Sequence, residues 1–145
     1  MPLSNDVRKY TYADYLLFRD DERWEIIDGI PYMQSAPSWQ HQSISRELLR
    51  QFANYMLAKP CEVFAAPFDL GLSEAGKEDK DITDVYQPDL VVICDKVLLK
   101  GTGYFGVPDL VIEIISPSTA KKDRLLKFNS MKNLELKSIG LLSRM

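Results

Sequence analysis

The sequence predicts a small α/β (α+β) domain in which a mixed sheet is flanked by helices. Two observations lead to this class. Apolar runs rich in β-branched residues alternate with segments of helical periodicity, and Pro or Gly separates the two kinds of segment. The length of 145 residues and the fractions of 46% hydrophobic and 27% charged residues fit one globular domain.

The N-terminal part predicts a short helix and a hairpin. Residues 11–18 carry apolar side chains at helical spacing, and Thr11 can cap the helix. Residues 24–33 read as two strands around Asp28 and Gly29, because Asp-Gly between alternating apolar residues is the strongest short signal for a hairpin.

The middle of the chain predicts a long helix and two strands. Residues 39–58 carry one apolar stripe at helical spacing, and Pro60 ends the helix. Residues 61–67 and 68–72 read as strands, and the polar segment 73–83 reads as an exposed loop.

Two further strands are expected at about residues 89–94 and 109–115, joined by a loop that contains three glycines. Ser and Thr after the second strand can cap a basic helix over residues 120–129. Each of these strands follows a proline and begins with an aspartate, so an acidic residue stands at the start of each.

Glu113 is the most informative residue. It is the one polar residue in the run Leu-Val-Ile-Glu-Ile-Ile over 110–115. A buried carboxylate is costly, so it has a partner, a shifted pKa or a metal. If the two strands pair antiparallel, Asp89 approaches Glu113, whereas Asp109 lies about 13 Å away along the strand. Asp109 is then expected to be a strand-start or capping residue.

A pair of carboxylates at this position predicts a divalent metal site. Asp89, Glu113 and the backbone carbonyl of Ile114, with waters, suit Mg²⁺ or Mn²⁺. Such an ion activates water and stabilises charge that develops on a phosphate. A nearby lysine would assist; the position two residues after Glu113 is Ile115, but the following helix offers Lys121 and Lys127.

Charge and targeting signals exclude several classes of protein. The net charge of −3 argues against a constitutive, high-affinity nucleic-acid binder, though not against an enzyme with one local basic patch. No run of eighteen apolar residues occurs, so no membrane partner is expected, and the N-terminus lacks the order of a signal peptide. Cys61 and Cys94 are expected to be reduced, buried thiols of a cytoplasmic protein.

Several motifs occur in one order: Trp-Glu-Ile-Ile-Asp-Gly, Pro-Ser-Trp-Gln-His-Gln, Glu-Val-Phe-Ala-Ala-Pro-Phe-Asp, Gln-Pro-Asp-Leu, Pro-Asp-Leu-Val-Ile-Glu-Ile-Ile-Ser-Pro-Ser-Thr and Lys-Asp-Arg-x-x-Lys-Phe. In these motifs the chain resembles the Uma-type family of restriction-endonuclease-like proteins, which is abundant in cyanobacteria and belongs to the PD-(D/E)XK nuclease superfamily. The resemblance covers about residues 10–129. It implies a restriction-endonuclease-like fold and a metal-dependent endonuclease, a hydrolase of phosphodiester bonds with nucleic acid, above all DNA, as substrate.

The resemblance also implies roles for single residues. Asp89 matches the Asp of the Pro-Asp motif, and Glu113 matches the acidic residue of the third strand. Ile115 departs from the lysine of the superfamily, and Lys127 matches the family's lysine in the Asp-Arg-x-x-Lys stretch. Lys127 is therefore the candidate for a lysine that has moved to the next helix.

Three residues are auxiliary candidates. Glu25 matches the family's first glutamate, and either helps to bind metal or is a solvated hairpin residue. His41 matches the family's histidine at the start of the long helix; the alternative is a residue that only caps or flanks that helix. Lys121 either contacts phosphate or belongs to a solvated helix face.

The C-terminus departs from the family pattern. Residues 1–129 are expected to form the domain, and residues 130–145 an atypical tail. Plausible codons for the tail, read one nucleotide earlier, can spell the family ending with Glu-Tyr-Trp-Ile-Val, so a frameshift is our hypothesis. The fold would then lack its last strand, with the exposed edge covered by the new tail or by a second chain in a homodimer. The alternative to an endonuclease is a catalytically inactive remnant, or a binding or oligomeric domain.

Overall fold

The computed structural model describes residues 8–72, 77–115 and 139–143. The described strands form two sheets, a larger one in the order β2-β1-β5-β4-β8-β7 and a smaller one in the order β10-β9-β6-β3. Most neighbouring strands run antiparallel, but β4–β8 and β9–β10 run parallel, so the predicted mixed α/β architecture is confirmed. The strands are β1 (Arg23–Ile27), β2 (Ile30–Gln34), β3 (Glu62–Ala65), β4 (Asp69–Gly71), β5 (Val85–Tyr86), β6 (Leu90–Ile93), β7 (Leu99–Lys100), β8 (Gly103–Phe105), β9 (Leu110–Ile115) and β10 (Ile139–Ser143).

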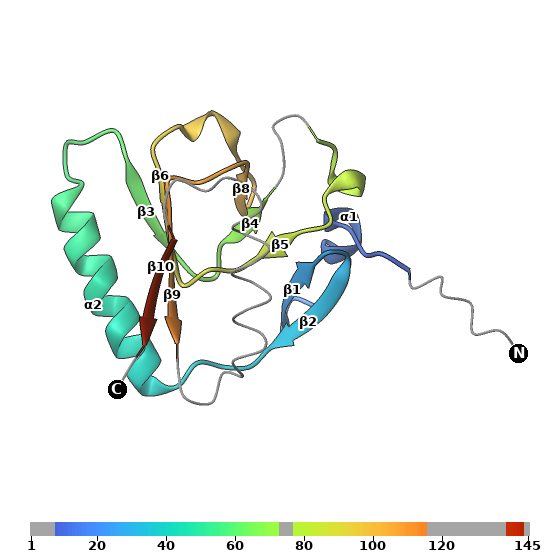
Figure 1. The fold of residues 1–145 in the computed structure, drawn as a ribbon, viewed down its shortest axis with the longest axis horizontal. Coiled ribbons are helices and arrows are strands. Elements are labelled where there is room, and N and C mark those ends of the chain that lie inside the picture. Colours follow the sequence, from blue (N-terminus) through green and yellow to red (C-terminus); the bar gives the residue numbers. More distant parts are fainter. Residues whose placement is uncertain (1–7, 73–76, 116–138, 144–145) are drawn as a thin grey trace, which may run out of the picture.

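The described helices are short except one. α1 (Tyr12–Tyr15) begins with a capping box, in which the Thr11 backbone N–H donates to Asp14 Oδ2 at 2.9 Å. α2 (Trp39–Tyr55) contacts β3 and β9 and stands along one side of the smaller sheet (Figure 1). Two single 3₁₀ turns, η1 (Asp79–Asp81) and η2 (Lys96–Leu98), lie in connections. None of these described helices has the length and apolar character that a membrane crossing needs.

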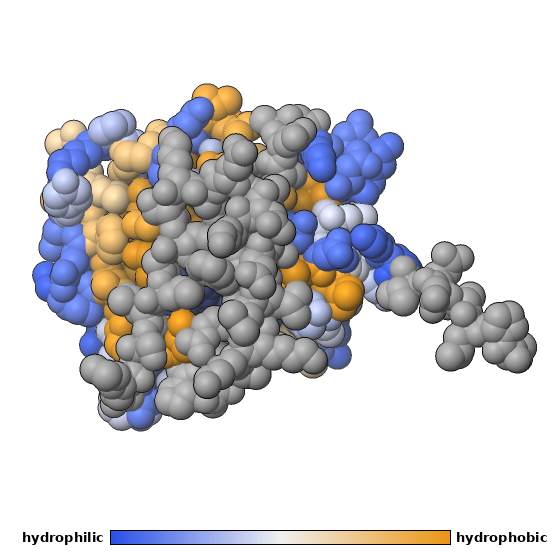
Figure 2. Space-filling model, in the orientation of Figure 1, coloured by the Kyte–Doolittle hydropathy of each residue, from blue (hydrophilic) through white to orange (hydrophobic). Residues whose placement is uncertain are grey.

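α2 forms where it is predicted but ends three residues early, and Tyr55 of the predicted apolar stripe is 69% exposed. The Ser38 hydroxyl accepts from the His41 N–H at 3.2 Å and caps the first turn. The helix stops at Tyr55, and Ala58 takes a left-handed conformation with φ 60° before Pro60. Hydrophilic residues lie along the outer edge of the molecule over α2, and hydrophobic ones lie beside them toward the sheet (Figure 2).

The Asp-Gly hairpin is confirmed. β1 and β2 pair antiparallel in a register that puts Ile27 opposite Ile30, so Asp28 and Gly29 are the two turn residues. Both have positive φ, 49° and 77°, which is the geometry of a type I′ turn. A Cβ at position 29 would lie 2.7 Å from the Lys9 Cβ, so close approach adds a second reason for glycine.

The chain crosses from the larger to the smaller sheet between β5 and β6. β5 pairs with β1 and β4, whereas β6 pairs with β3 and β9. Residues 87–89 make this crossing, and Pro88 within it is fully buried. The main core packs around the crossing and joins both sheets, with fully buried Leu70, Tyr86, Val91, Ile93 and Val111 among its members.

Part of the predicted glycine-bearing loop is a pair of strands. β7 and β8 form a short antiparallel pair, and β8 lies parallel to β4. Gly103 permits this approach, because a Cβ there would overlap the Asp69 carbonyl oxygen. Glycine is depleted in strands, so the same residue that allows the pairing makes the segment read as a loop.

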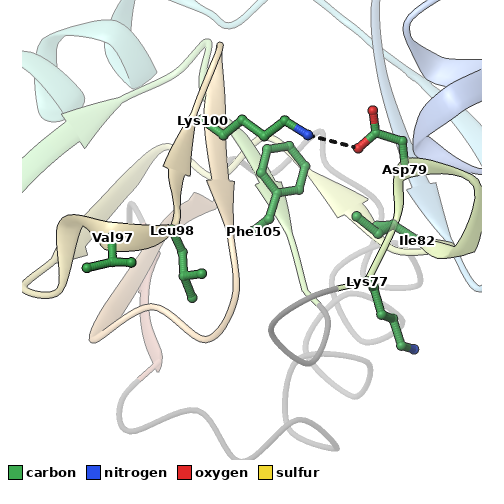
Figure 3. A pocket seen from close by; sticks show the side chains of 7 residues that line it. All are labelled: Lys77, Asp79, Ile82, Val97, Leu98, Lys100 and Phe105. Atoms are coloured by element: carbon green, nitrogen blue, oxygen red, sulfur yellow. Dashed lines mark hydrogen bonds and ion pairs between the residues drawn. The ribbon is translucent and has the colours of Figure 1, made fainter.

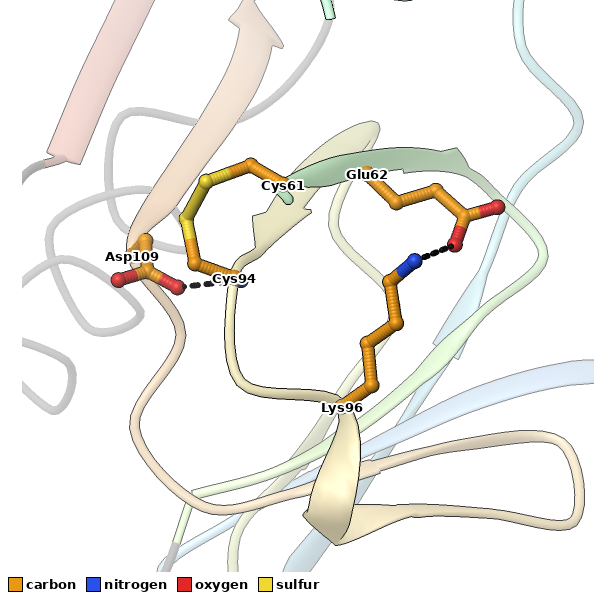
Figure 4. Close-up of a disulfide and its surroundings, with 5 residues drawn as sticks. All are labelled: Cys61, Glu62, Cys94, Lys96 and Asp109. Carbon is orange, nitrogen blue, oxygen red and sulfur yellow. Dashed lines mark hydrogen bonds and ion pairs between the residues drawn. A yellow bond between two sulfur atoms is a disulfide. The ribbon is translucent and has the colours of Figure 1, made fainter. Parts of the chain in front are cut away.

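The prediction of free thiols is wrong. Cys61 and Cys94 form a disulfide, with their Cα atoms 3.9 Å apart (Figure 4). β3 and β6 pair in a register with Glu62 opposite Ile93, so the two cysteines face each other just beyond the paired residues. A separation of 33 residues gives no disulfide signal by itself, and only the strand register brings the two sulfurs together.

The expectation of a missing last strand is also wrong. Residues Ile139–Ser143 of the tail form β10, which pairs parallel to β9 from Val111 to Ile115. The tail therefore covers the edge of β9, as one of the two alternatives proposed. Backbone pairing needs only N–H and C=O groups, so a tail outside the recognisable motifs can still occupy an open edge. The predicted helix 120–129 lies outside the described residues.

Candidate functional site

Asp89 lies where the crossing segment enters β6. Its Oδ2 accepts from the Ile114 N–H at 2.6 Å, and its Oδ1 lies 3.1 Å from His41 Nε2. The side chains of Asp89 and His41 are 13% and 16% exposed. The carboxylate is thus held from two sides, by a strand of the smaller sheet and by the first turn of α2.

Glu113 stands across from Asp89. β6 and β9 pair antiparallel, as predicted, with Leu90 opposite Ile112. One step further along this register, Asp89 faces Glu113. Opposed residues of an antiparallel pair point to the same face, with Cβ atoms about 4.5–5.5 Å apart. The register therefore sets Asp89 and Glu113 opposite each other, and Glu113 is half-buried.

Asp109 has a different place, at the far end of the same strand pair. Its Oδ2 accepts from the Cys94 N–H at 2.7 Å (Figure 4). Its own N–H donates to the Val92 carbonyl at 3.0 Å. The predicted role as a strand-start and capping residue is confirmed.

Glu25 is inside the molecule. It lies in β1 with only 3% of its surface exposed, and its Oε2 accepts from the Gln87 N–H at 2.9 Å. The alternative of a solvated hairpin residue is therefore wrong. Through this hydrogen bond Glu25 is tied to the crossing segment two residues before Asp89.

A second buried carboxylate was not singled out as a site residue from the sequence. Asp69, in β4, is 6% exposed and accepts from Tyr15 Oη at 2.7 Å and from Thr102 Oγ1 at 2.6 Å. Burial, followed by the neighbouring Asp69, raises the pKa of the Tyr15 hydroxyl. The sequence does contain a pattern that could have identified Asp69. It is an acidic residue between the apolar residues Phe68 and Leu70, as Glu113 is an acidic residue within an apolar run.

The candidate site matches a divalent cation in ligand type. Asp89 and Glu113 supply carboxylate oxygens, the donors that Mg²⁺ prefers together with water. Within the described ranges no three His, Cys, Asp or Glu side chains are grouped so as to hold a metal ion. A site here would therefore rest on two carboxylates, main-chain oxygen and water. Lys121 and Lys127 lie outside the described residues.

A shallow pocket of about 180 Å³ lies elsewhere, between η1, η2 and β8. Lys100 Nζ and Asp79 Oδ1 lie 3.5 Å apart beside it (Figure 3). Among the described candidate residues, neither the carboxylates Asp89, Glu113 and Glu25 nor His41 lines this pocket. The residues that line it are Lys77, Asp79, Ile82, Val97, Leu98, Lys100 and Phe105.

Comparisons with known proteins agree with the fold. A crystal structure titled as "a putative nuclease belonging to DUF820" from Anabaena variabilis superposes with a TM-score of 0.74 over 92% of this chain and 73% of that one, at 15% identity. The likeness confirms the restriction-endonuclease-like fold that was expected from the resemblance.

The sequence has relatives as well. An "Uncharacterized protein" from Synechocystis sp. is 33% identical over 122 residues, which are 83% of this chain. The chain spans 60% of that relative's length. The Uma2 family, described as "Putative restriction endonuclease", matches residues 10–141, a range that runs past residue 129 into the tail. With this match over most of its length, the chain belongs to the Uma2 family.

Proposed function

We propose that this protein is a metal-dependent endonuclease that hydrolyses phosphodiester bonds of DNA. The observation that carries the proposal is the register of β6 and β9, which sets Asp89 opposite Glu113 at the start of β6, in a chain of the Uma2 family. Two carboxylates on one face of an antiparallel pair are a ligand set for a hard divalent cation. The nuclease title of the Anabaena variabilis structure adds support for this class of activity.

The metal would be Mg²⁺ or Mn²⁺, held by Asp89 and Glu113 with the Ile114 carbonyl and water. When bound, such an ion would supply Lewis acidity, which favours activation of water and offsets negative charge on a phosphate. Asp89 is oriented for this task, because the Ile114 N–H fixes its Oδ2 and leaves Oδ1 toward His41. His41 would act through Asp89 as a positioning residue, since its Nε2 contacts Oδ1 directly.

Three further residues complete the proposal. Glu25 is assigned a supporting role at the metal, on the strength of its burial and its bond to the crossing segment. Lys127 is assigned to the attacking water from the family motif, and Lys121, just before that motif, is assigned to phosphate from its charge. Lysine supplies a compact positive charge that favours charge on a phosphate in the transition state.

The substrate is expected to bind weakly. The net charge is −3, so attraction to phosphates must come from a local patch and fall steeply with salt. Cleavage should therefore be sought at low ionic strength. The site of action would be the cytoplasm, where reducing conditions open disulfides, so the activity should be measured with and without reductant.

The test is nicking of supercoiled plasmid DNA with Mn²⁺, comparing Asp89→Asn with Asp109→Asn. Both changes keep a side-chain oxygen that can accept the backbone hydrogen bond, from Ile114 or from Cys94. Nicking by the native chain that is lost in Asp89→Asn and kept in Asp109→Asn supports the proposal. Equal loss in both variants, or no nicking by a folded native chain, contradicts it.

A catalytically inactive, metal-binding or nucleic-acid-binding domain is the second candidate. Ile115 favours it, because this buried isoleucine occupies the place of the superfamily lysine. Mn²⁺ titration by calorimetry separates the two candidates. Saturable binding without nicking identifies a binding domain, and binding with nicking identifies the nuclease.

A homodimer is the proposed assembly. Among the described strands, β2 ends the larger sheet on one side, and its Ile30 and Met33 are 44% and 61% exposed. Exposed apolar side chains on an open edge favour pairing with another chain. Light scattering should give twice the mass of the chain, and Met33→Lys should shift it toward the monomer. A native chain that is monomeric at all concentrations contradicts this part.

A further inference from the structure

Gln87 is the best-connected side chain of the crossing segment. Its Oε1 accepts from Arg23 Nε at 2.9 Å, and its Nε2 donates to Tyr15 Oη at 2.7 Å and to Asp69 Oδ1 at 3.3 Å. Its backbone N–H donates to Glu25 Oε2. Both ends of the amide are thus satisfied by groups from β1, α1 and β4.

The partners of Gln87 are themselves fixed. Asp69 is held by Thr102 on both its side chain and its main chain, since Thr102 Oγ1 donates to Oδ2 and the Asp69 N–H donates to the Thr102 carbonyl at 3.1 Å. Glu25 is buried within β1. Gln87 therefore joins a part-buried hydrogen-bond network with Arg23, Tyr15 and Asp69, called the Gln87 frame below. Polar networks whose groups are paired are more rigid than isolated hydrogen bonds.

The next two residues connect Gln87 to the candidate site. Pro88 is fully buried and its ring restricts the backbone, and Asp89 follows directly. The Asp89 carbonyl accepts from the Ala66 N–H at 3.1 Å, so its main chain is held as well. Between the Gln87 frame and Asp89 only the proline peptide intervenes.

The chemistry of the position favours an amide. The Gln87 Nε2 faces a carboxylate oxygen of Asp69, and its backbone N–H faces that of Glu25. An acid here would bring a third carboxylate beside two buried ones, and an apolar side chain would leave Asp69 and Arg23 each short of a hydrogen bond.

We propose that Gln87 is a positioning residue of the active site, which fixes Asp89 and Glu25 relative to each other for divalent-cation binding. The proposal rests on the proposed function. It adds to the metal site a residue that touches neither metal nor DNA and acts only through its neighbours. Groups that orient metal ligands typically change metal affinity by about 10–100-fold when they are removed.

The experiment compares Gln87→Met with Gln34→Met. Methionine keeps the length of the side chain and removes both hydrogen-bonding ends. Gln34, in β2, undergoes the same change outside this network; among the described residues its Nε2 makes one hydrogen bond, of 3.4 Å, to the Tyr32 carbonyl. Tyr15→Phe is the milder variant; it removes one partner of Gln87 and serves if Gln87→Met does not fold.

Two readouts are taken on folded samples: Mn²⁺ affinity by calorimetry, and kcat and KM separately for plasmid nicking. We expect Gln87→Met to weaken Mn²⁺ binding by about 10-fold or more and to lower kcat with an unchanged KM for DNA, whereas Gln34→Met leaves all three unchanged. Tyr15→Phe should weaken Mn²⁺ binding in the same direction by a smaller factor. A loss of thermal stability alone would not produce this pattern.

The outcomes distinguish the two levels of the proposal. A native chain that binds no Mn²⁺ overturns the proposed function and this inference together. A native chain that binds Mn²⁺ and nicks DNA, with Gln87→Met or Tyr15→Phe binding Mn²⁺ equally well, overturns only the role of Gln87. A loss in Gln34→Met as large as in Gln87→Met also overturns it.

Discussion

At the scale of the residue, variants of Glu25 distinguish a role in stability from a role in metal binding. Glu25→Ala removes the acceptor of the buried Gln87 N–H, so we expect a loss of about 1–3 kcal/mol in the free energy of unfolding. Glu25→Gln keeps an acceptor oxygen and should cost less than about 1 kcal/mol. Urea unfolding followed by fluorescence measures both.

The same pair of variants reports on the metal. If Glu25 supports the cation, Glu25→Gln weakens Mn²⁺ binding although it stays folded, because the charge is lost while the hydrogen bond is kept. A variant that is stable and binds Mn²⁺ as the native chain does would make Glu25 a structural residue only. Equal destabilisation by Ala and Gln would contradict the assigned hydrogen bond.

Single residues were predictable from the sequence where a local pattern carried them. Glu113 stood out in an apolar run, and strand periodicity then selected Asp89 over Asp109, which the register of β6 and β9 bears out. The hydrogen bonds of Gln87 were beyond reach, because its partner Tyr15 lies 72 residues away. No local pattern states which polar groups meet across such a distance.

At the scale of the element, the β1–β2 turn depends on one glycine. Gly29→Ala forces a side chain into φ 77° and against the Lys9 Cβ, so we expect a loss of about 1–2 kcal/mol or more. Gly101→Ala is the matched control: φ there is 56°, but a Cβ would meet nothing within 4 Å. Its cost should be the smaller of the two in urea unfolding. A larger cost at Gly101 would contradict the role given to the Lys9 contact.

Elements were predictable when their signals were local. The hairpin at Asp28-Gly29 and the start of α1 at Thr11 depend on neighbouring residues, and both occur. β8 was missed because Gly103 is selected by the close approach of β4, a contact from a distant segment. β10 was missed because an open strand edge accepts almost any backbone.

At the scale of the whole molecule, three tyrosines of the fold are expected to lower the free energy of unfolding at alkaline pH. Burial is the first cause that raises the pKa of Tyr12, Tyr15 and Tyr104 above the ordinary value. In the folded chain these phenols keep their protons where the unfolded chain loses them. Their contribution to the free energy of unfolding is therefore fully present below about pH 10. It is lost as the pH rises through the pKa values of the tyrosines in the folded chain.

Each such tyrosine lowers the free energy of unfolding by up to about 1.4 kcal/mol per pH unit above about pH 10. Tyr15→Phe should reduce this slope, although it also lowers stability at neutral pH by removing the bond to Asp69. Urea unfolding at neutral pH and at several alkaline pH values measures how steeply the free energy of unfolding falls with pH, separately from its value at neutral pH. A variant that keeps the native slope would show that Tyr15 titrates alike in both states.

The disulfide links the edge of the smaller sheet to its interior. β3 has only β6 as a strand partner among the described residues, and the Cys61–Cys94 bond fastens the two where the pairing ends. The two cysteines are 33 residues apart, so the bond lowers the conformational entropy of the unfolded chain. In the chain-entropy model this raises the free energy of unfolding by about 3–4 kcal/mol. Reductant should lower the stability of the native chain by about this amount. The Cys61→Ser/Cys94→Ser double variant should be as unstable as the reduced chain, and indifferent to reductant.

Reduction should nevertheless spare the candidate site. Cys94 follows the last residue of β6, whereas Asp89 precedes the first, so the whole strand and its pairing with β9 lie between the disulfide and the carboxylates. Samples that are folded with and without reductant should therefore nick plasmid DNA at equal rates per molecule. A rate that changes severalfold while the chain stays folded would mean that the bond fixes the register of β6, and with it the distance between Asp89 and Glu113. Two titratable thiols in the unreduced native chain would show that Cys61 and Cys94 are not bonded there.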